Sequence, residues 1–543
     1  MPKAKFKKTD VTSTVPSPEH YMYPKSKTLK NKYGITNLDA FTARCAHDSA
    51  KAMINLREAP LPEKFDSSYL CLIHQRLFEN TFEWAGQTRN VPFTFEDGTI
   101  AVAPVMKKIT SFAVGSELQE GLQKLDQTLA EKNNLQDLSC KEFAHEAAKI
   151  FASLNYTHPF REGNGRTQRI FFENLAKAAG HQLDFSLVTK ERMLVASVAA
   201  IQNDNLEPMQ HLFEDISNPN KILLLKEFMS SMKELGRNVN DRPVMVTKEG
   251  ETYTGTYRGA GLNSFACNVK GAYIIGNKEH LTPEQLKTLK PGDKFTFTVP
   301  KTKELESILI PEERLAPLTK NETAQMVAED SCVHVSLKQV QKLSKIVYGS
   351  TKTLDKQMVE IIKNPSLGQQ LANKIERAPH SISRLAGFSL CGLQNQARAN
   401  AKNHLEMLCT AVANFTYAVK YAEKEITQEH ATEQNRRAQT VEMPNQSLQD
   451  LFALPKELQQ EALAKNPLCQ KELSNFVKKI NTRLSPNEHQ AVQNNDYETL
   501  AQSIGVSENK AKQITQIIKQ TKEVHQQAQV CITHRSKAFA MAC

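Results

Sequence analysis

The chain has few of the features that stabilise small secreted domains or hold a protein in a membrane. Its 543 residues include only ten cysteines and one tryptophan. No two cysteines have Cys-x-x-Cys spacing, which argues against a zinc site or a disulfide framework and favours a reducing compartment. No apolar run is long enough for a transmembrane helix, and the basic segment 1–8 is not followed by the apolar stretch of a Sec signal.

Length and charge set wide limits on what the protein does. A chain of 543 residues is too long for one hydrophobic core, and a prior of roughly 100 to 200 residues per domain suggests about three or four domains. The formal net charge of +10 and the pI near 8.9 favour anionic partners such as nucleotides, acidic proteins or an anionic membrane surface. Solubility alone explains the charge equally well, so the function must come from motifs.

Residues 158–169, with the sequence HPFREGNGRTQR, carry the strongest chemical signal. The preceding segment, 141–157, has apolar residues three and four apart, which predicts an amphipathic helix. Pro159 disfavours helical backbone at the residue before it, so the chain is expected to turn there. A second helix is predicted from Arg166, with Gly180 as its C-terminal stop. The motif is therefore a loop that leads into a helix N-terminus.

This loop has the parts of a phosphate site. The backbone N–H groups of Gly163, Asn164 and Gly165 are expected beside the positive end of a helix dipole, where a phosphate is stabilised. Arg166 and Arg169 lie three residues apart, close enough for both guanidinium groups to contact a polyphosphate.

Two more side chains would add chemistry to that site. Glu162 is a hard oxygen ligand, and one carboxylate together with substrate phosphates is a usual way to hold Mg²⁺. His158 is a base that can accept the proton of an attacking hydroxyl near neutral pH. Each residue alone would be explained as an ordinary loop or ion-pair residue. Together, in one glycine-rich turn before a helix, they indicate a nucleotide site.

The motif resembles that of the Fic family, His-x-Phe-x-Asp/Glu-Gly-Asn-Gly-Arg-x-x-Arg, at every fixed position. The similarity extends upstream to Phe65-Asp66 and to the turn Glu83-Trp84-Ala85-Gly86. The resemblance implies an α-helical domain that uses ATP and Mg²⁺. It implies the following roles: His158 as general base, Glu162 as metal ligand, Gly163, Asn164 and Gly165 as the anion hole, and Arg166 and Arg169 as phosphate ligands.

The resemblance also bears on the reaction. Fic relatives that act as kinases carry a bulkier residue at the position of Gly165 and bind ATP reversed. Glycine at this position therefore favours AMP transfer to a Tyr, Thr or Ser hydroxyl of a protein, with release of pyrophosphate. Phe160 is expected to be a core residue beneath the loop.

A β-hairpin is predicted between residues 91 and 102, with Asp97-Gly98 as its turn. It is either a structural ribbon or, as the resemblance implies, a flap that pairs with an extended segment of the target protein. We favour the flap, because the hairpin is isolated among helices. Its predicted docking residues are Val91, Phe93, Thr94, Phe95, Glu96, Asp97, Gly98, Thr99 and Ile100.

Two further N-terminal segments carry hypotheses. Ser116 to Gly121 matches the Ser-x-x-x-Glu-Gly inhibition motif of Fic proteins and of their small antitoxin partners, in which the glutamate, here Glu120, would pair with Arg169. Its position between flap and motif departs from the usual ones. Residues 1–28 are predicted to be a flexible arm. Its Tyr21 and Tyr23 are either modification sites in a disordered tail or, as we favour, docked on the next domain.

The middle of the chain changes character. After a Fic domain over residues 29–235, five short alternating segments in 236–302 predict a small OB-like β-barrel, with a short helix at 283–289 before the last strand. Tyr253, Tyr257, Arg258, Lys270 and Tyr273 could form a nucleic-acid surface. A spacer or docking role is about as well supported, and no nucleic acid is expected.

The last part of the chain is predicted to be helical. Around Val347-Tyr348-Gly349 and Leu385-Ala386-Gly387, residues 303–450 resemble the BID bundle of Bartonella effectors, which reach host cells through a type IV secretion system. Residues 451–543 are expected to be a helical extension with a basic secretion-signal tail. From residue 510 onward there are six Lys or Arg and one acid, which is also typical of a solvated tail.

The whole chain is thus expected to be a mainly α-helical, multidomain adenylyltransferase of the Bartonella effector family. It would be made in the bacterial cytoplasm and delivered to the host cytosol or plasma membrane. Expected partners are host target proteins, the secretion coupling machinery through the C-terminal half, an antitoxin chain, and a host membrane or signalling protein through the BID-like part. Two alternatives are a non-enzymatic effector that acts through that part and transfer of another phosphate-containing group.

Overall fold

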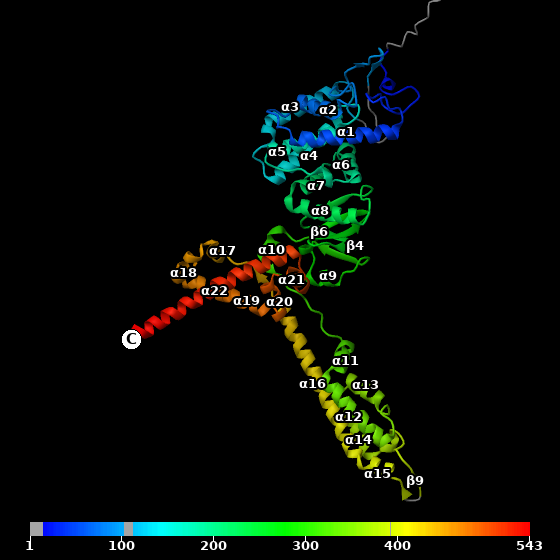
Figure 1. Cartoon of the computed structure of the whole chain (residues 1–543), viewed down its shortest axis with the longest axis vertical. Helices are drawn as coiled ribbons and strands as arrows, with labels where there is room; N and C mark the ends of the chain where they lie inside the picture. The colour runs from blue at the N-terminus through cyan, green and yellow to red at the C-terminus, as the bar shows by residue number, and fades with distance from the viewer. Residues whose placement is uncertain (1–14, 103–111, 391–392, 543) are drawn as a thin grey trace, which may run out of the picture. The chain divides into compact units, whose positions relative to one another are not determined.

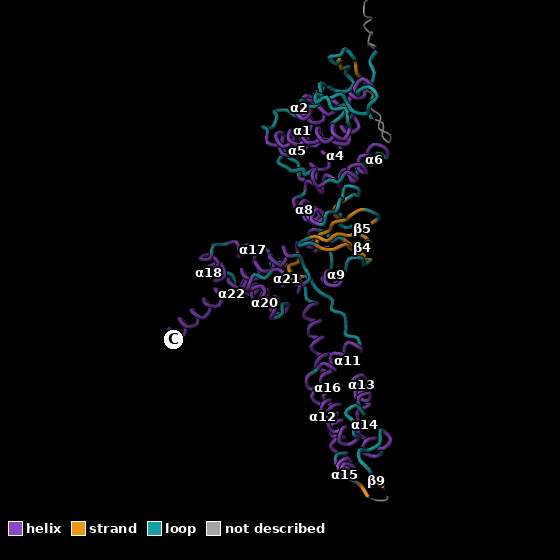
Figure 2. The backbone as a smooth tube through the Cα atoms, turned by 45° about the vertical axis from the view of Figure 1, so that its right-hand side comes forward, coloured by secondary structure: helices purple, strands orange, loops and turns teal. Residues whose placement is uncertain are grey.

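The computed structural model describes residues 15–102, 112–390 and 393–542, and divides the chain into two compact units (Figure 1). The first unit is Met1–Leu281 with Leu289–Thr302, and the second is Thr282–Thr288 with Lys303–Cys543. Both units are mainly helical (Figure 2). In the part of the chain that the structure describes, no helix has an apolar stretch long enough to cross a membrane. The predicted mainly α-helical, multidomain class is confirmed.

The N-terminal part of the first unit is an α-helical domain. The predicted helix over 141–157 is present, and two more helices precede it, at 38–58 and 67–78. Each of the three is begun by a side chain that caps its free N–H groups: Asn37, Asp66 and Ser139. Its helices are α1 (Leu38–Glu58), α2 (Ser67–Phe78), α3 (Ser116–Glu131), α4 (Cys140–Thr157), α5 (Asn164–Ala178), α6 (Lys190–Gln202), α7 (Glu207–Ser217) and α8 (Pro219–Glu234), with short 3₁₀ turns η1 (Pro18–Tyr21), η2 (Asn133–Leu135) and η3 (Phe185–Leu187).

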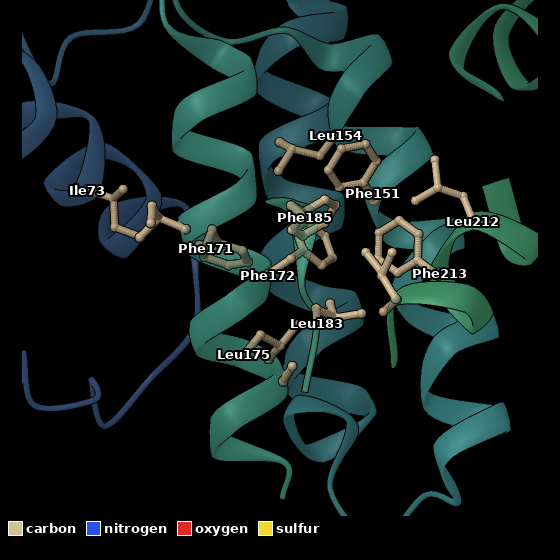
Figure 3. Packing of buried hydrophobic residues seen from close by; sticks show 14 of the residues in the cluster. Ile73, Phe151, Leu154, Phe171, Phe172, Leu175, Leu183, Phe185, Leu212 and Phe213 are labelled. Carbon is tan, nitrogen blue, oxygen red and sulfur yellow. The ribbon is translucent and has the colours of Figure 1, made fainter. Parts of the chain in front are cut away.

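An aromatic core fixes α4 and α5 relative to each other. Phe151 of α4 lies 5.2 Å from Phe172 of α5 and 5.3 Å from Phe213 of α7, measured between ring centroids. In Figure 3, Phe172 lies toward Phe185, whereas its neighbour Phe171 lies on the side of Ile73. Since α5 is buried on both sides, the loop that joins α4 to α5 has firmly positioned ends.

The arm is folded where the structure describes it. Tyr21 is buried and meets Trp84 edge to face, with ring centroids 5.6 Å apart. Met22 and Leu29 form an antiparallel β-bridge. The prediction of a flexible arm is therefore wrong for Pro18 to Thr28, because burial of the Tyr21 ring anchors this segment on the helical domain.

The middle segment forms a five-stranded sheet in the order β3-β6-β5-β4-β7 (Figure 2). All five predicted strands are present, and β3 pairs in parallel with β6, whereas the other pairs are antiparallel. No pairing between β3 and β7 closes the sheet within the described residues, so the predicted barrel is described as a sheet. The strands are β3 (Val244–Val246), β4 (Thr252–Ala260), β5 (Ser264–Val269), β6 (Ala272–Asn277) and β7 (Lys294–Thr298), with η4 (Lys278–His280) after β6.

The aromatic residues of this sheet pack inward. Tyr257 is buried, the Tyr253 ring stacks on Phe297 at 5.5 Å, and Tyr273 lies 5.3 Å from Phe228 of α8. Tyr257 is therefore a core residue, and Tyr253 and Tyr273 are half-buried against neighbouring rings, which reduces the aromatic surface that a nucleic acid could stack on.

A buried ion pair joins the sheet to the helices. The Arg192 guanidinium lies 2.7 Å from Asp215 and donates a second hydrogen bond to the carbonyl of Val244 in β3. The same Asp215 oxygen accepts the N–H of Val246 at 2.9 Å. Asp215 has no exposed side-chain surface, so water cannot replace these partners if one is lost.

The second unit has two hydrophobic cores. One lies among α11 (Lys320–Glu329), α12 (Ser331–Tyr348), α13 (Asp355–Lys363), α14 (Leu367–Arg377), α15 (Gln396–Asn403) and α16 (Leu405–Arg437). The other lies among α17 (Gln446–Ala453), α18 (Lys456–Lys465), α19 (Pro467–Arg483), α20 (Pro486–Asn494), α21 (Tyr497–Ile504) and α22 (Glu508–Ala542). The remaining elements are α9 (Pro283–Thr288), α10 (Thr302–Ser307), β8 (Ile308–Ile310), η5 (Pro379–Ser381), β9 (Ser389–Leu390), β10 (Leu393–Gln394) and β11 (Val441–Glu442).

These cores do not follow the predicted boundaries. Leu309, Ile310 and Val441 lie inside the predicted 303–450 bundle but belong to the second core, because β8 pairs with β11. The basic residues from 510 onward lie on helix α22. The first half of that helix buries Ile514 and Ile518.

The buried ion pair makes a stability prediction. Replacing Asp215 with Ala should lower the free energy of unfolding of the first unit by about 3 to 5 kcal/mol, because Arg192 would stay buried without its partner. Urea unfolding followed by fluorescence of Trp84, the single tryptophan, measures this change. Lys132→Met, which removes the partly exposed ion pair with Glu146, is the control and should change stability by less than about 1 kcal/mol. Equal unfolding midpoints for the two variants would contradict the assignment.

Candidate active site

His158 lies where helix α4 ends. It is the C-cap residue, with a left-handed backbone (φ 45°, ψ 59°), and its N–H donates to the carbonyl of Leu154 at 3.0 Å. Its side chain is 8% exposed, and its ring stacks on Phe112 with centroids 3.9 Å apart. The turn predicted ahead of Pro159 is therefore present, and it places an imidazole at the end of a rigid helix.

Helix α5 begins six residues later with free backbone donors. Gly163, its N-cap, has φ 89° and makes no side-chain capping hydrogen bond. Arg166 and Thr167 both direct their N–H groups to the carbonyl of Gly163 at 3.1 Å. No acceptor for the N–H groups of Gly163, Asn164 or Gly165 is found in the described part of the chain. The helix start thus offers unsatisfied donors and the positive end of its dipole.

Glycine is required at the first of these positions. A Cβ on Gly163 would lie 2.3 Å from the Phe78 ring, and the positive φ would strain any other residue. At Gly165 the only neighbour of an added Cβ within 4 Å is Arg169 Nη2, at 3.7 Å. Gly165 therefore leaves the space at the start of α5 open.

Asn164 shapes the loop with its side chain. Its Oδ1 accepts the N–H of Phe160 at 2.9 Å, and its Nδ2 donates to the carbonyl of Phe160 at 2.7 Å. Phe160 itself is buried and stacks on His74 at 3.9 Å, as expected for a core residue beneath the loop. The Asn164 amide is thus engaged with the loop, which leaves its backbone N–H as the group available to a phosphate.

The two arginines differ in their surroundings. Arg166 donates to Ser49 Oγ at 2.9 Å, lies 3.3 Å from Glu162, and places its guanidinium over the Phe78 ring. Arg169 donates from Nε to the carbonyl of Gly165 at 2.9 Å, and burial lowers its pKa. The Glu162 side chain is 48% exposed, so its carboxylate is accessible beside the helix start.

The predicted hairpin is present as β1 (Phe93–Thr94) and β2 (Ile100–Ala101), an antiparallel pair. Lys30 lies 2.8 Å from Asp97 in the turn, and its ammonium group is 4.3 Å from the centre of the Phe95 ring. Phe95 is buried, so its side chain belongs to the core rather than to a docking surface. Val91, at 49% exposure, remains open to contact.

Glu120, the residue of the inhibition hypothesis, is exposed on α3. No contact between it and Arg169 is found in the part of the chain that the structure describes. The next residue, Gly121, fits closely against Thr157, because an added Cβ would lie 2.3 Å from the Thr157 hydroxyl. Gly121 therefore has a packing role of its own between α3 and α4, and the inhibitory pairing of Glu120 stays a prediction.

Sequence analysis missed His74, which supports the loop from beneath. Its Nδ1 accepts the N–H of Gly86 at 2.8 Å, so its Nε2 carries the proton and donates to the carbonyl of Glu162 at 3.0 Å. Burial lowers the pKa of His74 to about 3, which keeps the ring neutral in this arrangement. A lone histidine in an amphipathic helix gave no signal of this role.

Sequence analysis also missed Arg89, which is 2% exposed and donates to the carbonyl of His158 at 2.7 Å. It comes three residues after the Glu-Trp-Ala-Gly turn, but arginine is rarely buried, and nothing in the local pattern marked it.

Comparison with known proteins gives the family. Residues 64–176 match the Fic/DOC family, and residues 245–297 match the intracellular delivery domain, which here covers most of the sheet rather than the helical C-terminal part. A solved structure of the type IV secretion system effector protein BepA is 72% identical, covers 53% of this chain and 99% of its own, and superposes with a TM-score of 0.52. Protein adenylyltransferase VbhT of Bartonella schoenbuchensis is 33% identical over 34% of this chain and 36% of its own length.

A protein adenylyltransferase of Bartonella henselae is 64% identical over 545 residues, which cover 100% of both chains. The motif residues described above and this similarity along the full length agree, and the chain therefore belongs to the family of Fic-domain protein adenylyltransferases of Bartonella.

Proposed function

We propose that this chain transfers AMP from ATP to a Tyr, Thr or Ser hydroxyl of a host protein and releases pyrophosphate. One observation carries the proposal: the end of α4 presents the His158 ring, and the start of α5, reached by a six-residue motif segment, presents unpaired N–H groups. A base and an anion hole are thereby held by two helices of one core. This is the arrangement that a phosphoryl transfer reaction needs.

The donor set fits a nucleotide with magnesium. The N–H groups of Gly163, Asn164 and Gly165, with Arg166 and Arg169, would bind the phosphates. Glu162, exposed beside that helix start, would hold Mg²⁺, which when bound offsets the negative charge of the phosphates. Glu162 forms an ion pair with Arg166 in this structure, which is compatible with this role. On nucleotide binding, Glu162 would leave Arg166 to bind the metal, and Arg166 would bind a phosphate.

The chemical step follows from these positions. His158 accepts the proton of the target hydroxyl, and the hydroxyl oxygen attacks the α-phosphorus. The bond from that phosphorus to the bridging oxygen breaks, and the electron pair leaves with pyrophosphate. The anion-hole N–H groups and the arginines stabilise the charge that moves onto the phosphate oxygens.

The hairpin is proposed as the site where the target docks. The carbonyl of Ile100 in β2 already accepts the N–H of Ser17 at 3.1 Å and lies 2.7 Å from Nδ1 of His20. The arm thus covers that edge, and β1, with exposed Val91 before it, is the edge left for an extended target segment. Main-chain pairing of this kind tolerates varied target sequences.

The rest of the chain suggests an effector that works in a host cell. We infer type IV delivery into host cells from the similarity to BepA, with the C-terminal half as the part that the secretion coupling machinery recognises. The BID-like helices would also contact a host membrane or signalling protein, and an antitoxin chain would restrain the enzyme in the bacterium. If instead the C-terminal half alone produced the host response, that response would survive loss of His158.

The base makes the first functional prediction. With ATP labelled at the α-phosphate, the wild-type chain should label host proteins, and His158→Ala should reduce the rate at least about 100-fold, because the proton acceptor is lost. ATP labelled at the γ-phosphate should give no labelled protein. The reverse pattern of labels would make the chain a kinase and contradict AMP transfer.

The metal ligand makes a second prediction. Glu162→Gln should raise the Mg²⁺ concentration needed for half-maximal labelling by at least about tenfold, because an amide oxygen is a weaker ligand than a carboxylate. The titration of initial rate against Mg²⁺ measures this shift. Glu173→Gln is the matched control, because Glu173 lies further along α5 and forms an ion pair with Arg57. An unchanged Mg²⁺ dependence in Glu162→Gln would remove this residue from the metal site.

A further inference from the structure

Arg89 is a buried arginine whose side chain donates hydrogen bonds to main-chain carbonyls at and near the end of α4. Its Nε donates to the carbonyl of His158 at 2.7 Å, and its Nη2 donates to that of Thr157 at 3.3 Å and to that of Ala113. Its own N–H donates to the carbonyl of Pro159 at 2.8 Å. One residue therefore holds three consecutive peptide units, from 157 to 159, and the base is the middle one.

The geometry of His158 explains why such support matters. Its left-handed backbone is uncommon for a residue with a side chain and costs free energy that surrounding contacts must offset. The last carbonyls of a helix also lack intrahelical donors, and a guanidinium group offers several in one plane. Arg89 supplies donors to two such carbonyls, those of residues 157 and 158.

A second contact fixes the ring itself. Phe112 stacks on the imidazole with an interplanar angle of 18°, and the next residue, Ala113, is one of the three carbonyl partners of Arg89. The N–H of Ala113 donates to the carbonyl of Tyr156 at 3.1 Å. Arg89 therefore holds both sides of the stack: the backbone that carries His158 and the segment that carries Phe112.

We propose that Arg89 is the positioning residue of the catalytic base, which sets the orientation of the His158 imidazole without contacting substrate. The inference rests on the proposed function, since it assumes that His158 accepts the proton. Its consequence is kinetic. Nucleotide binding would use groups from Gly163 onward, and no contact of Arg89 with them is found among the described residues, whereas the proton transfer step depends on the ring that Arg89 positions.

The test measures the initial rate of labelling of host-lysate proteins from α-labelled ATP, at varied ATP concentration, with the full-length chain. Arg89→Met should lower the maximal rate by about 100-fold, as expected for an imidazole misplaced by about 1 Å, and leave the apparent KM for ATP within about twofold of wild type. Arg89→Lys, which keeps one donor group of the same charge, should recover part of the rate, to within about tenfold of wild type.

Arg192→Met and Arg192→Lys are the matched controls, because Arg192 is also buried, also donates to a main-chain carbonyl, and lies in the same compact unit away from the motif. Trp84 fluorescence during urea unfolding gives the stability of each variant. At equal loss of stability, the Arg192 variants should keep the wild-type maximal rate per folded molecule. If Arg89→Met does not fold, Arg89→Lys against Arg192→Lys carries the comparison.

Three results would overturn the proposal: an unchanged maximal rate in both Arg89 variants, a rise in KM for ATP at unchanged maximal rate, or a loss of rate that the Arg192 variants share. Failure of the proposed function is distinct from these results, because wild-type chain would then transfer no label from α-labelled ATP.

Discussion

The sharp turn between α4 and α5 is the constraint on which the site depends. A helix that ends in a left-handed histidine and a helix that starts at a left-handed glycine must lie close enough for one substrate to reach both. The contacts of Phe151 with Phe172 and Phe213 hold the helices in place. The loop itself contributes little freedom, since Asn164 bonds both polar groups of the Phe160 backbone. In the proposed reaction, the base and the anion hole would therefore be fixed before a nucleotide binds, which is how electrostatic catalysis avoids reorganisation during the reaction.

Buried polar residues do the rest of this positioning. His74 bonds the carbonyl of Glu162 from below, and Arg89 bonds the carbonyl of His158 from the other side. A buried polar side chain costs free energy unless its donors have partners. Backbone conformations that move the carbonyls away from His74 or Arg89 are therefore disfavoured. Residues near the N-terminus hold the hairpin as well: His20 of the arm lies 2.7 Å from the carbonyl of Ile100, and Lys30, just after the arm, lies 2.8 Å from Asp97. The parts of the site thus come from distant stretches of sequence.

Features that depend on neighbouring residues in the chain could be predicted from the sequence. Spacing of apolar residues located α4, and alternation located all five strands of the sheet. The motif predicted which side chains gather at the loop, because its glycines and Pro159 constrain the backbone directly. It did not predict the supports of that loop. Arg89 and His74 act through contacts 69 and 88 residues away in the chain, and a residue type that is usually exposed or ambiguous carries no signal of such a contact.

Other features of the fold lie beyond what local pattern determines. Alternating strands do not fix the parallel pairing of β3 with β6, since it depends on the path of the connections. The packing of Gly121 against Thr157 likewise joins residues that are far apart in the sequence. The division of the C-terminal half depended on the pairing of β8 with β11, two segments of two or three residues that pattern alone does not bring together.

The most direct test of the account is the intact mass of a host protein after incubation of host-cell lysate with the purified chain, ATP and Mg²⁺. The account predicts an increase by one adenylyl group on a Tyr, Thr or Ser hydroxyl, absent when His158 is replaced by Ala. An increase by one phosphoryl group, or an adenylyl increase that persists without His158, would contradict it.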